Sequence, residues 1–261
     1  MHNNPKSHGV FIRQLLALAS FYLFLSIPTS LKAQEKGRFI LSANWHPQTN
    51  WLVNENDYDA FKERDYVLDY SVVNYGACIG FITKNHVGLY SGIIYSEQGQ
   101  TYLDRTVSNG LVTNEVESQT KLTYLKIPLL FRYCGDPGYT AGGSKKKKSR
   151  LIFELGPQWS MLQEARFFED GSLIQLQEPI GKTVDAEEAF NRNNLDLVIG
   201  LGTNFRITRH LYFVLVARFD YSLNDVENKD FIYQGSHFYP VVRLGTRAGT
   251  FGLNLGFELR L

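Results

Sequence analysis

The sequence predicts an all-β fold, an eight-stranded antiparallel up-and-down transmembrane β-barrel. Three observations support this fold class: a final strand with one apolar face, an N-terminal segment of the kind that directs export, and connections that alternate between short and long. Together they indicate a chain that is exported and enters a membrane with strands.

The final strand is the clearest of these features. Between residues 251 and 261, apolar side chains occupy every odd position, and glycine, amide or charged residues occupy the even ones. The apolar set is Phe251, Leu253, Leu255, Phe257, Leu259 and Leu261. Because successive side chains of a strand point to opposite sides, this strand has one apolar and one polar face.

Residues 1–33 have the features of a secretory signal peptide. Basic residues precede the apolar run Leu15–Ile27, and a short segment that ends at Ala33 follows it. The run is shorter than the ~20 residues that a transmembrane helix needs, so retention as an anchor is the weaker alternative. We therefore expect cleavage after Ala33 and a mature barrel over residues 34–261.

The same alternation recurs in seven earlier segments, which gives eight strands in all. These segments are 37–46, 70–82, 86–96, 125–133, 151–161, 195–206 and 210–223. Short turns fall at Lys84-Asn85 and Thr208-Arg209, whereas long loops are expected near 47–69, 97–118, 163–192 and 223–248. This arrangement is typical of bacterial outer-membrane barrels, whose short turns face the periplasm.

The polar faces of the strands carry charges of both signs. A soluble barrel turns its apolar face inward, whereas a membrane barrel turns it outward. The polar set is rich in glycine and poor in lysine, which favours the membrane orientation. Its charged members form the predicted lumenal network: Lys126, Arg132, Glu154, Asp196, Arg206, Arg218, Asp220, Glu258 and Arg260.

An eight-stranded barrel leaves an interior that side chains can fill. Buried charges need partners, so the mixed signs predict a closed, salt-bridged lumen rather than an open pore. Arg218 and Glu258, on adjacent strands, are the pair that we expect first.

Three further features have mainly structural interpretations. Pro128 lies inside a predicted strand, where its missing N–H predicts a bulge or local edge. Cys78 and Cys134 are expected to be buried free thiols, with a disulfide as the alternative. Lys145–Lys148 lie in a glycine-rich turn that we expect to be solvated, although anionic headgroups or a periplasmic partner could contact it.

Catalytic and cofactor motifs are lacking. Ser236-His237 with Asp230 is the only local serine, histidine and carboxylate cluster, and it falls in a predicted loop. Zinc and phosphate-loop spacings are absent. The near balance of 27 basic and 26 acidic residues argues against nucleic acid as a partner. We therefore expect no enzyme activity, no cofactor and no metal.

The segment Tyr124–Tyr133, with its run Tyr-Leu-Lys-Ile-Pro-Leu-Leu, resembles the fourth strand of the PorT-like outer-membrane β-barrel family. The strand Leu151-Ile-Phe-Glu-Leu before Gly156-Pro157 and the closing Leu253-Asn-Leu-Gly-Phe-Glu-Leu are similar too. The resemblance implies an eight-stranded barrel in an outer membrane. One branch of that family is tied to protein secretion across this membrane.

The sequence thus predicts a monomeric outer-membrane protein, in contact with membrane lipid, whose long extracellular loops have a surface-binding or structural role. An extracellular ligand or a secretion-machinery protein is the expected partner. A secretion accessory, a small pore and a lipid-modifying barrel enzyme are the alternatives.

Overall fold

A computed structural model describes residues 37–54, 64–83, 85–108, 111–135, 149–174, 176–177, 183–184, 186–228 and 245–261. All of them belong to one compact unit, Gly37–Leu261. The predicted signal peptide, the Lys145–Lys148 turn and the Ser236-His237 cluster lie outside the described residues.

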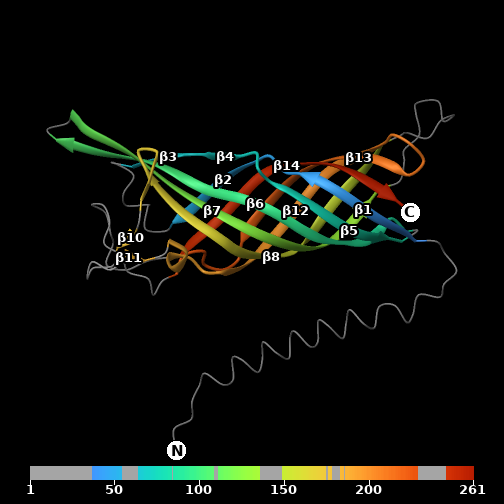
Figure 1. Cartoon of the computed structure of the whole chain (residues 1–261). Helices are drawn as coiled ribbons and strands as arrows, with labels where there is room; N and C mark the ends of the chain where they lie inside the picture. Colours follow the sequence, from blue (N-terminus) through green and yellow to red (C-terminus); the bar gives the residue numbers. More distant parts are fainter. Residues whose placement is uncertain are drawn as a thin grey trace, which may run out of the picture. The chain divides into compact units, whose positions relative to one another are not determined.

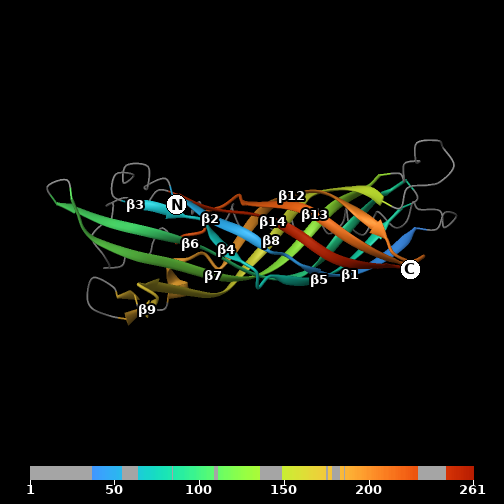
Figure 2. The same ribbon diagram turned by 90° about the horizontal axis from the view of Figure 1, so that it is seen from above.

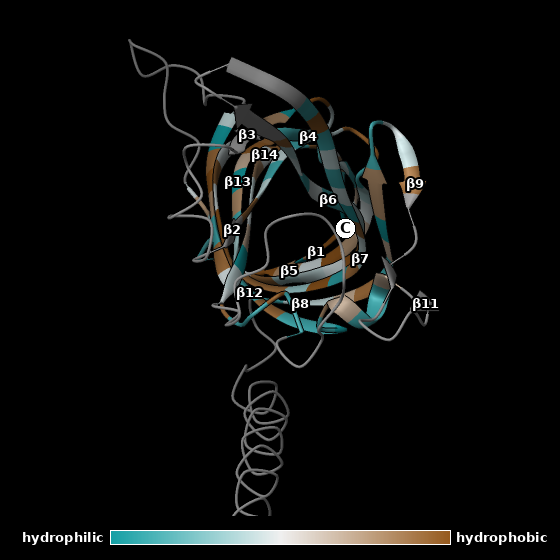
Figure 3. Cartoon of the chain, turned by 90° about the vertical axis from the view of Figure 1, so that its left-hand side faces the viewer, coloured by the Kyte–Doolittle hydropathy of each residue, from teal (hydrophilic) through white to brown (hydrophobic). Residues whose placement is uncertain are grey.

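The strands of this unit close into an antiparallel ring of eight, which confirms the predicted fold class (Figure 3). The first two ring members are each split into two pieces. In ring order the strands are β1 (Arg38–Trp45) with β2 (Gln48–Asn54), β5 (Tyr75–Ile82) with β4 (Asp69–Ser71), β6 (Val87–Ser108), β7 (Leu111–Cys134), β8 (Ser149–Glu169), β12 (Asn193–Arg206), β13 (Leu211–Ser222) and β14 (Thr246–Arg260).

The first and last strands close the ring. β14 pairs with β1 from Ile40↔Arg260 to Trp45↔Leu255, and it continues along β2 from Gln48↔Gly252. Between the two pieces, the Leu253 N–H donates to the Pro47 carbonyl oxygen at 3.0 Å. The ladder therefore passes the break at His46-Pro47 without losing its register.

In the described part of the chain, four short strands and one short helix lie outside the eight-stranded ring. β3 (Arg64–Val67) pairs with β6, and β9 (Ser172–Ile174) pairs with β8. β10 (Leu176–Gln177) and β11 (Thr183–Val184) pair with each other, and a 3-10 helix, η2, spans Ala186–Ala189. No helix within the described residues is long and apolar enough to cross a membrane.

The alternation predicted from the sequence sorts side chains between the outside and the lumen. On β12, Leu197, Ile199 and Leu201 are exposed, whereas Asp196 and Val198 are buried. The lumen is less polar than predicted, since an apolar cluster shares it with the charges. This cluster consists of Ile40, Cys78, Ile82, Tyr90, Ile94, Leu130, Cys134, Ile152, Val198, Val214 and Val216.

The two ends of the barrel differ, and we name them the short-turn end and the loop end. At the short-turn end, β5 joins β6 across 83–86 and β12 joins β13 across 207–210, as the sequence predicts. At the loop end, β6 and β7 form a hairpin that reaches past the neighbouring strands (Figures 1 and 2).

This hairpin corrects the predicted loop at 97–118, and β8, which runs to Glu169, corrects the start of the loop predicted at 163–192. The physical reason is the composition of the outer face. Inward-facing Ser96, Gln98 and Gln100 are buried, but the outward residues next to them are no longer apolar. The sequence therefore shows no alternation of hydrophobicity, although the chain remains in a strand.

Pro128 forms the local edge that was one of the two predicted outcomes, and it does not form the bulge. β7 shifts its register on β8 at Thr123/Tyr124 instead, and Pro128 pairs in register with Gln158. The missing N–H of proline coincides with a gap in the β6–β7 ladder between the pairs Ser91↔Leu129 and Ile94↔Lys126.

Cys78 and Cys134 are buried and unbridged, as expected. They lie on β5 and β7, which β6 separates in the ring.

Candidate functional site

The lumen gathers eight of the nine charged residues predicted for it. All eight are at most 7% exposed. Four are basic and four are acidic, so the charges of the set sum to zero: Lys126, Arg132, Arg218 and Arg260 against Glu154, Asp196, Asp220 and Glu258. Such a balance is what burial requires, because an unpaired ion in an apolar interior is costly.

Arg132 is the centre of the first of two charge clusters. Its Nε donates to Glu154 Oε1 at 2.6 Å, and its guanidinium also forms an ion pair with Glu258. Arg260 Nη2 donates to the other oxygen of Glu258 at 2.9 Å. The guanidinium of Arg132 lies 3.6 Å from the ring centroid of Tyr90, a cation–π contact. Strands β6, β7, β8 and β14 are thus joined through the lumen.

Asp220 is the centre of the second cluster, nearer the loop end. Arg218 Nε donates to Asp220 Oδ1 at 2.7 Å, and Lys126 Nζ lies 3.3 Å from Asp220 Oδ2. The Gln158 amide donates both to Asp220 Oδ2, at 3.2 Å, and to Asp196 Oδ2, at 3.0 Å. The amide therefore lies between two carboxylates and links them.

The predicted pair between Arg218 and Glu258 is wrong. Both residues face the lumen, but the register places Arg218 beside Gly252 and Glu258 beside Tyr212. These positions are six residues apart along β13, which corresponds to about 20 Å at ~3.3 Å per residue. Inward parity gives the side of the strand on which a residue lies, but it does not give the position of that residue along the barrel axis.

Arg206 differs from the other eight predicted lumenal residues, because it is exposed. It is the last residue of β12, and its Nε donates to the Thr208 carbonyl oxygen at 3.1 Å. Its parity is inward, but it lies beyond the last layer of lumenal side chains and takes no part in the network.

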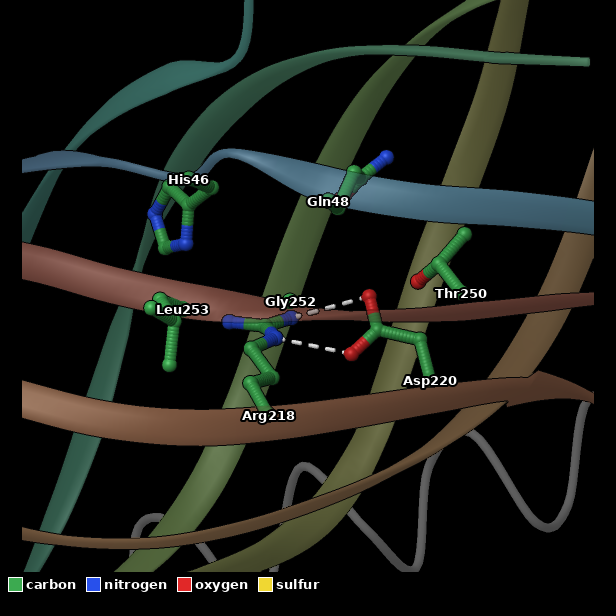
Figure 4. Close-up of a pocket in the computed structure, with 7 residues that line it drawn as sticks. All are labelled: His46, Gln48, Arg218, Asp220, Thr250, Gly252 and Leu253. Atoms are coloured by element: carbon green, nitrogen blue, oxygen red, sulfur yellow. Dashed lines mark hydrogen bonds and ion pairs between the residues drawn. The ribbon is translucent and has the colours of Figure 1, made fainter. Parts of the chain in front are cut away.

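A small cavity adjoins the second cluster (Figure 4). Its volume is about 10 Å³, close to that of a single water. The figure shows the Arg218 and Asp220 side chains joined by hydrogen bonds beside it. The lining residues are His46, Gln48, Arg218, Asp220, Thr250, Gly252 and Leu253. The cavity has no room for an organic substrate.

The loop end carries an apolar cap that sequence reasoning missed. Phe190, directly after η2, is buried and stacks on Phe167 with ring centroids 5.7 Å apart. The cap residues are Leu52, Leu122, Tyr124, Ala165, Ala189, Phe190, Val226 and Ala248. Asn191 Nδ2 donates to the Glu227 carbonyl oxygen at 2.9 Å, so the segment before β12 is tied to the segment after β13. Five of these residues lie on strands, but Ala189, Phe190 and Val226 do not, and the contact among all eight follows only from the tertiary fold.

The described residues offer no candidate metal site. No group of three or more histidine, cysteine or carboxylate side chains there could hold a metal ion.

A closed ring of strands with an apolar exterior and a charge-paired interior defines a transmembrane β-barrel. A family model described as "Outer membrane protein beta-barrel domain" matches residues 33–228, and the chain belongs to this family. It is therefore a protein of the outer membrane in contact with lipid, which confirms the predicted location. By the rule for such barrels, the short-turn end faces the periplasm and the loop end faces the exterior.

Several solved barrels are similar in fold. Neisserial surface protein A is 11% identical, with 87% of this chain and 100% of that chain covered and a TM-score of 0.40. OprG from Pseudomonas aeruginosa is 14% identical, with 87% and 97% covered and a TM-score of 0.39. A major outer membrane protein from Thermus thermophilus is 12% identical, with 87% and 100% covered and a TM-score of 0.41. No curated protein matches the chain.

Proposed function

We propose that the protein acts at the cell surface as a closed barrel whose extracellular half binds a ligand or a partner protein. The observation that carries this proposal is the β6–β7 hairpin. Outward-facing Tyr95 stacks on Tyr75 at 5.3 Å, and β6 continues for thirteen residues beyond it, from Ser96 to Ser108. At ~3.3 Å per residue this is about 40 Å of strand, more than a membrane anchor needs.

The extracellular half is also ordered beyond the hairpin. β3 pairs with β6, and β9 pairs with β8. The cap joins the segment before β12 to the segment after β13. Folding such a surface costs conformational entropy. A surface that is already ordered loses less entropy when it binds a partner, and a binding role would therefore explain why it is folded.

The proposal includes a lumen that is closed to ions and an absence of catalysis. The paired charges and the cap support the first part. Support for the second is that each of the four lumenal carboxylates is already held by a basic or amide side chain.

Membership of the PorT-like family is the narrower form of this proposal, and its support is the Tyr124–Tyr133 strand with its inward Lys126 and Arg132. A role in secretion would follow only for the one branch of that family that is tied to secretion. The test below separates it from recognition of an extracellular ligand.

The test is photo-crosslinking in intact cells. A photoreactive amino acid at Glu117 or Leu173, both exposed at the loop end, should give adducts with the partner. The same probe at Ile93, on the apolar outer face, is the matched control and should give none of these adducts. Adducts with secretion-machinery proteins would favour the secretion role, and lack of any protein or glycan adduct from either surface position would contradict the binding proposal.

A further inference from the structure

Arginine side chains gather at the periplasmic mouth of the lumen. Arg38 on β1, Arg150 on β8 and Arg260 on β14 all have inward parity, since Ile40 and Ile152, two residues further along β1 and β8, are buried in the lumen. Arg260 is itself buried, Arg150 is half-buried and Arg38 is exposed. β1 and β14 are neighbours in the ring and β8 lies opposite them, so Arg150 faces Arg38 and Arg260 across one opening.

Arg260 is the register partner of Ile40, which lies two residues along β1 from Arg38. The ring of Tyr212 lies beneath them, 4.0 Å from the Arg260 guanidinium. Arg206 follows at the end of β12, two residues beyond Asn204, which is the register partner of Arg150. Like charges so placed repel unless a counter-charge joins them.

Counter-charge from the protein is scarce at this end. Among the described residues of 37–42, 79–90, 131–153, 203–213 and 257–261, the only carboxylate side chain is that of Glu258. Glu258 already holds Arg132 and Arg260. Because the eight lumenal charges balance among themselves, no carboxylate side chain in these ranges is left to pair with Arg38, Arg150 or Arg206.

Polar atoms of two buried side chains beside the mouth also lack hydrogen-bond partners within the described part of the chain. Asn204 is 0% exposed, and neither its amide nitrogen nor its amide oxygen has a hydrogen-bond partner there. The Nε of Arg260 likewise has no hydrogen-bond partner there. Buried donors are almost always satisfied in folded proteins, by protein groups, by water or by a ligand.

We propose that this mouth, formed by Arg38, Arg150 and Arg260 with Asn204, is a binding site for a phosphate oxyanion. Guanidinium groups present forked donors that match phosphate oxygens, and the local excess of positive charge favours an anion, either the dianion of a phosphate monoester or the monoanion of a phosphodiester. The phosphate could belong to a small periplasmic phosphate or to the headgroup of an inner-leaflet lipid, because the chemistry is shared. The site is at the opposite end from the proposed surface function and does not depend on it.

The first experiment titrates the purified full-length barrel in a neutral detergent with inorganic phosphate, at constant ionic strength with chloride as the replaced anion. The double variant Arg38→Gln with Arg150→Gln should bind phosphate at least about tenfold more weakly than wild type, since it loses two charge-assisted hydrogen-bond donors. Arg209→Gln is the control for the loss of a positive charge at the same end, because Arg209 is exposed in the turn there. Arg150→Lys, which keeps the charge but not the fork, should show an intermediate loss.

The second experiment distinguishes the source of the phosphate. The barrel is placed in nanodiscs of phosphatidylcholine with or without phosphatidylglycerol, and native mass spectrometry counts the lipids that it retains. Retention of phosphatidylglycerol that the double variant loses and Arg209→Gln keeps would identify a lipid headgroup, even if free phosphate fails to bind. Heat-modifiable gel mobility shows that each variant is folded. Equal binding by wild type and the double variant in both experiments, or binding in neither, would overturn the proposal.

Discussion

Arg132 and Glu258 form an ion pair across the lumen. They come from β7 and β14, strands that are not neighbours in the ring and lie 126 residues apart in the chain. Both side chains are essentially inaccessible to solvent. This pair can form only when the barrel has closed, so it joins the two halves of the ring and fills the lumen at the same time.

The first prediction concerns this pair. Arg132→Met should destabilise the barrel by about 3–5 kcal/mol, because it leaves Glu154 and Glu258 buried beside a single remaining cation, Arg260. Glu258→Gln should also destabilise it strongly. The double variant should recover part of the combined loss, and urea unfolding in lipid vesicles measures all three free energies.

A matched control for the cycle is Arg166→Met. Arg166 pairs with Glu164 on the outer face of β8, where both side chains are about half exposed. Its loss should change stability little, since solvent screens such pairs. Strictly additive losses for Arg132 and Glu258 would show that the two side chains do not interact.

The second prediction concerns the lipid face. Leu215 on β13 and Leu255 on β14 are register partners with outward parity. Leu215→Arg should cost about 2–4 kcal/mol if it lies at the bilayer midplane, because a charge there has no partner in lipid. Leu173→Arg is the control, since Leu173 is 63% exposed on β9 at the loop end. Wild-type stability of Leu215→Arg in vesicles would mean that the face is assigned wrongly.

The third prediction concerns the contact of β12 with β13. A Cβ at Gly202 would lie against the backbone of Leu215 and Val216. Gly202→Ala should therefore push the strands apart and destabilise the barrel by about 1–3 kcal/mol. At Gly135 the nearest atom, Leu151 Cβ, would be 3.4 Å away, so Gly135→Ala should be tolerated. A thermal shift of equal size in both variants would contradict this reasoning.

The fourth prediction is that the wild-type barrel carries no steady ionic current in planar bilayers. Two charge clusters cross the lumen, and the cavity beside Asp220 is about the size of a water. A hydrated ion needs a wider continuous path. A stable large conductance would refute the closed lumen.

How far the sequence predicts this structure depends on whether a strand separates two environments. The strand ending at Leu261 was recognisable because lipid and lumen select opposite residue types, and the same contrast placed Glu154 and Arg218 inside. Beyond Tyr95 and Leu125 the outer face of the hairpin is no longer apolar, so the sequence predicts a loop where the structure has strands. The alternation depends on the membrane as well as on the strand.

Partners in the lumen were harder to predict than their orientation. Period 2 gives the side of the sheet, but a contact also requires the relative height of two strands, which depends on register and shear. Arg132 and Glu258 meet across the ring although no sequence neighbour connects them. The mouth arginines are a similar case, because only the closed ring brings the ends of β1 and β8, with Arg38 and Arg150, to one opening.

The last prediction concerns the cap at the loop end. Phe190→Ala should loosen the cap, because Phe190 loses its stacking on Phe167 and its burial among Leu122, Ala165 and Val226. The backbone bonds that Asn191 and Asn228 make around it would then open more often, in a local transition that leaves the strands intact. Hydrogen exchange should therefore rise at least several-fold over 186–192 and 224–228, while β12 and β13 keep their protection.

Leu173→Ala is the control for an exposed loop-end side chain and should leave exchange unchanged. The current across bilayers should stay at the wild-type level, since both charge clusters lie below the cap; exchange that rises equally in β12 and β13 would instead make Phe190 part of the global core.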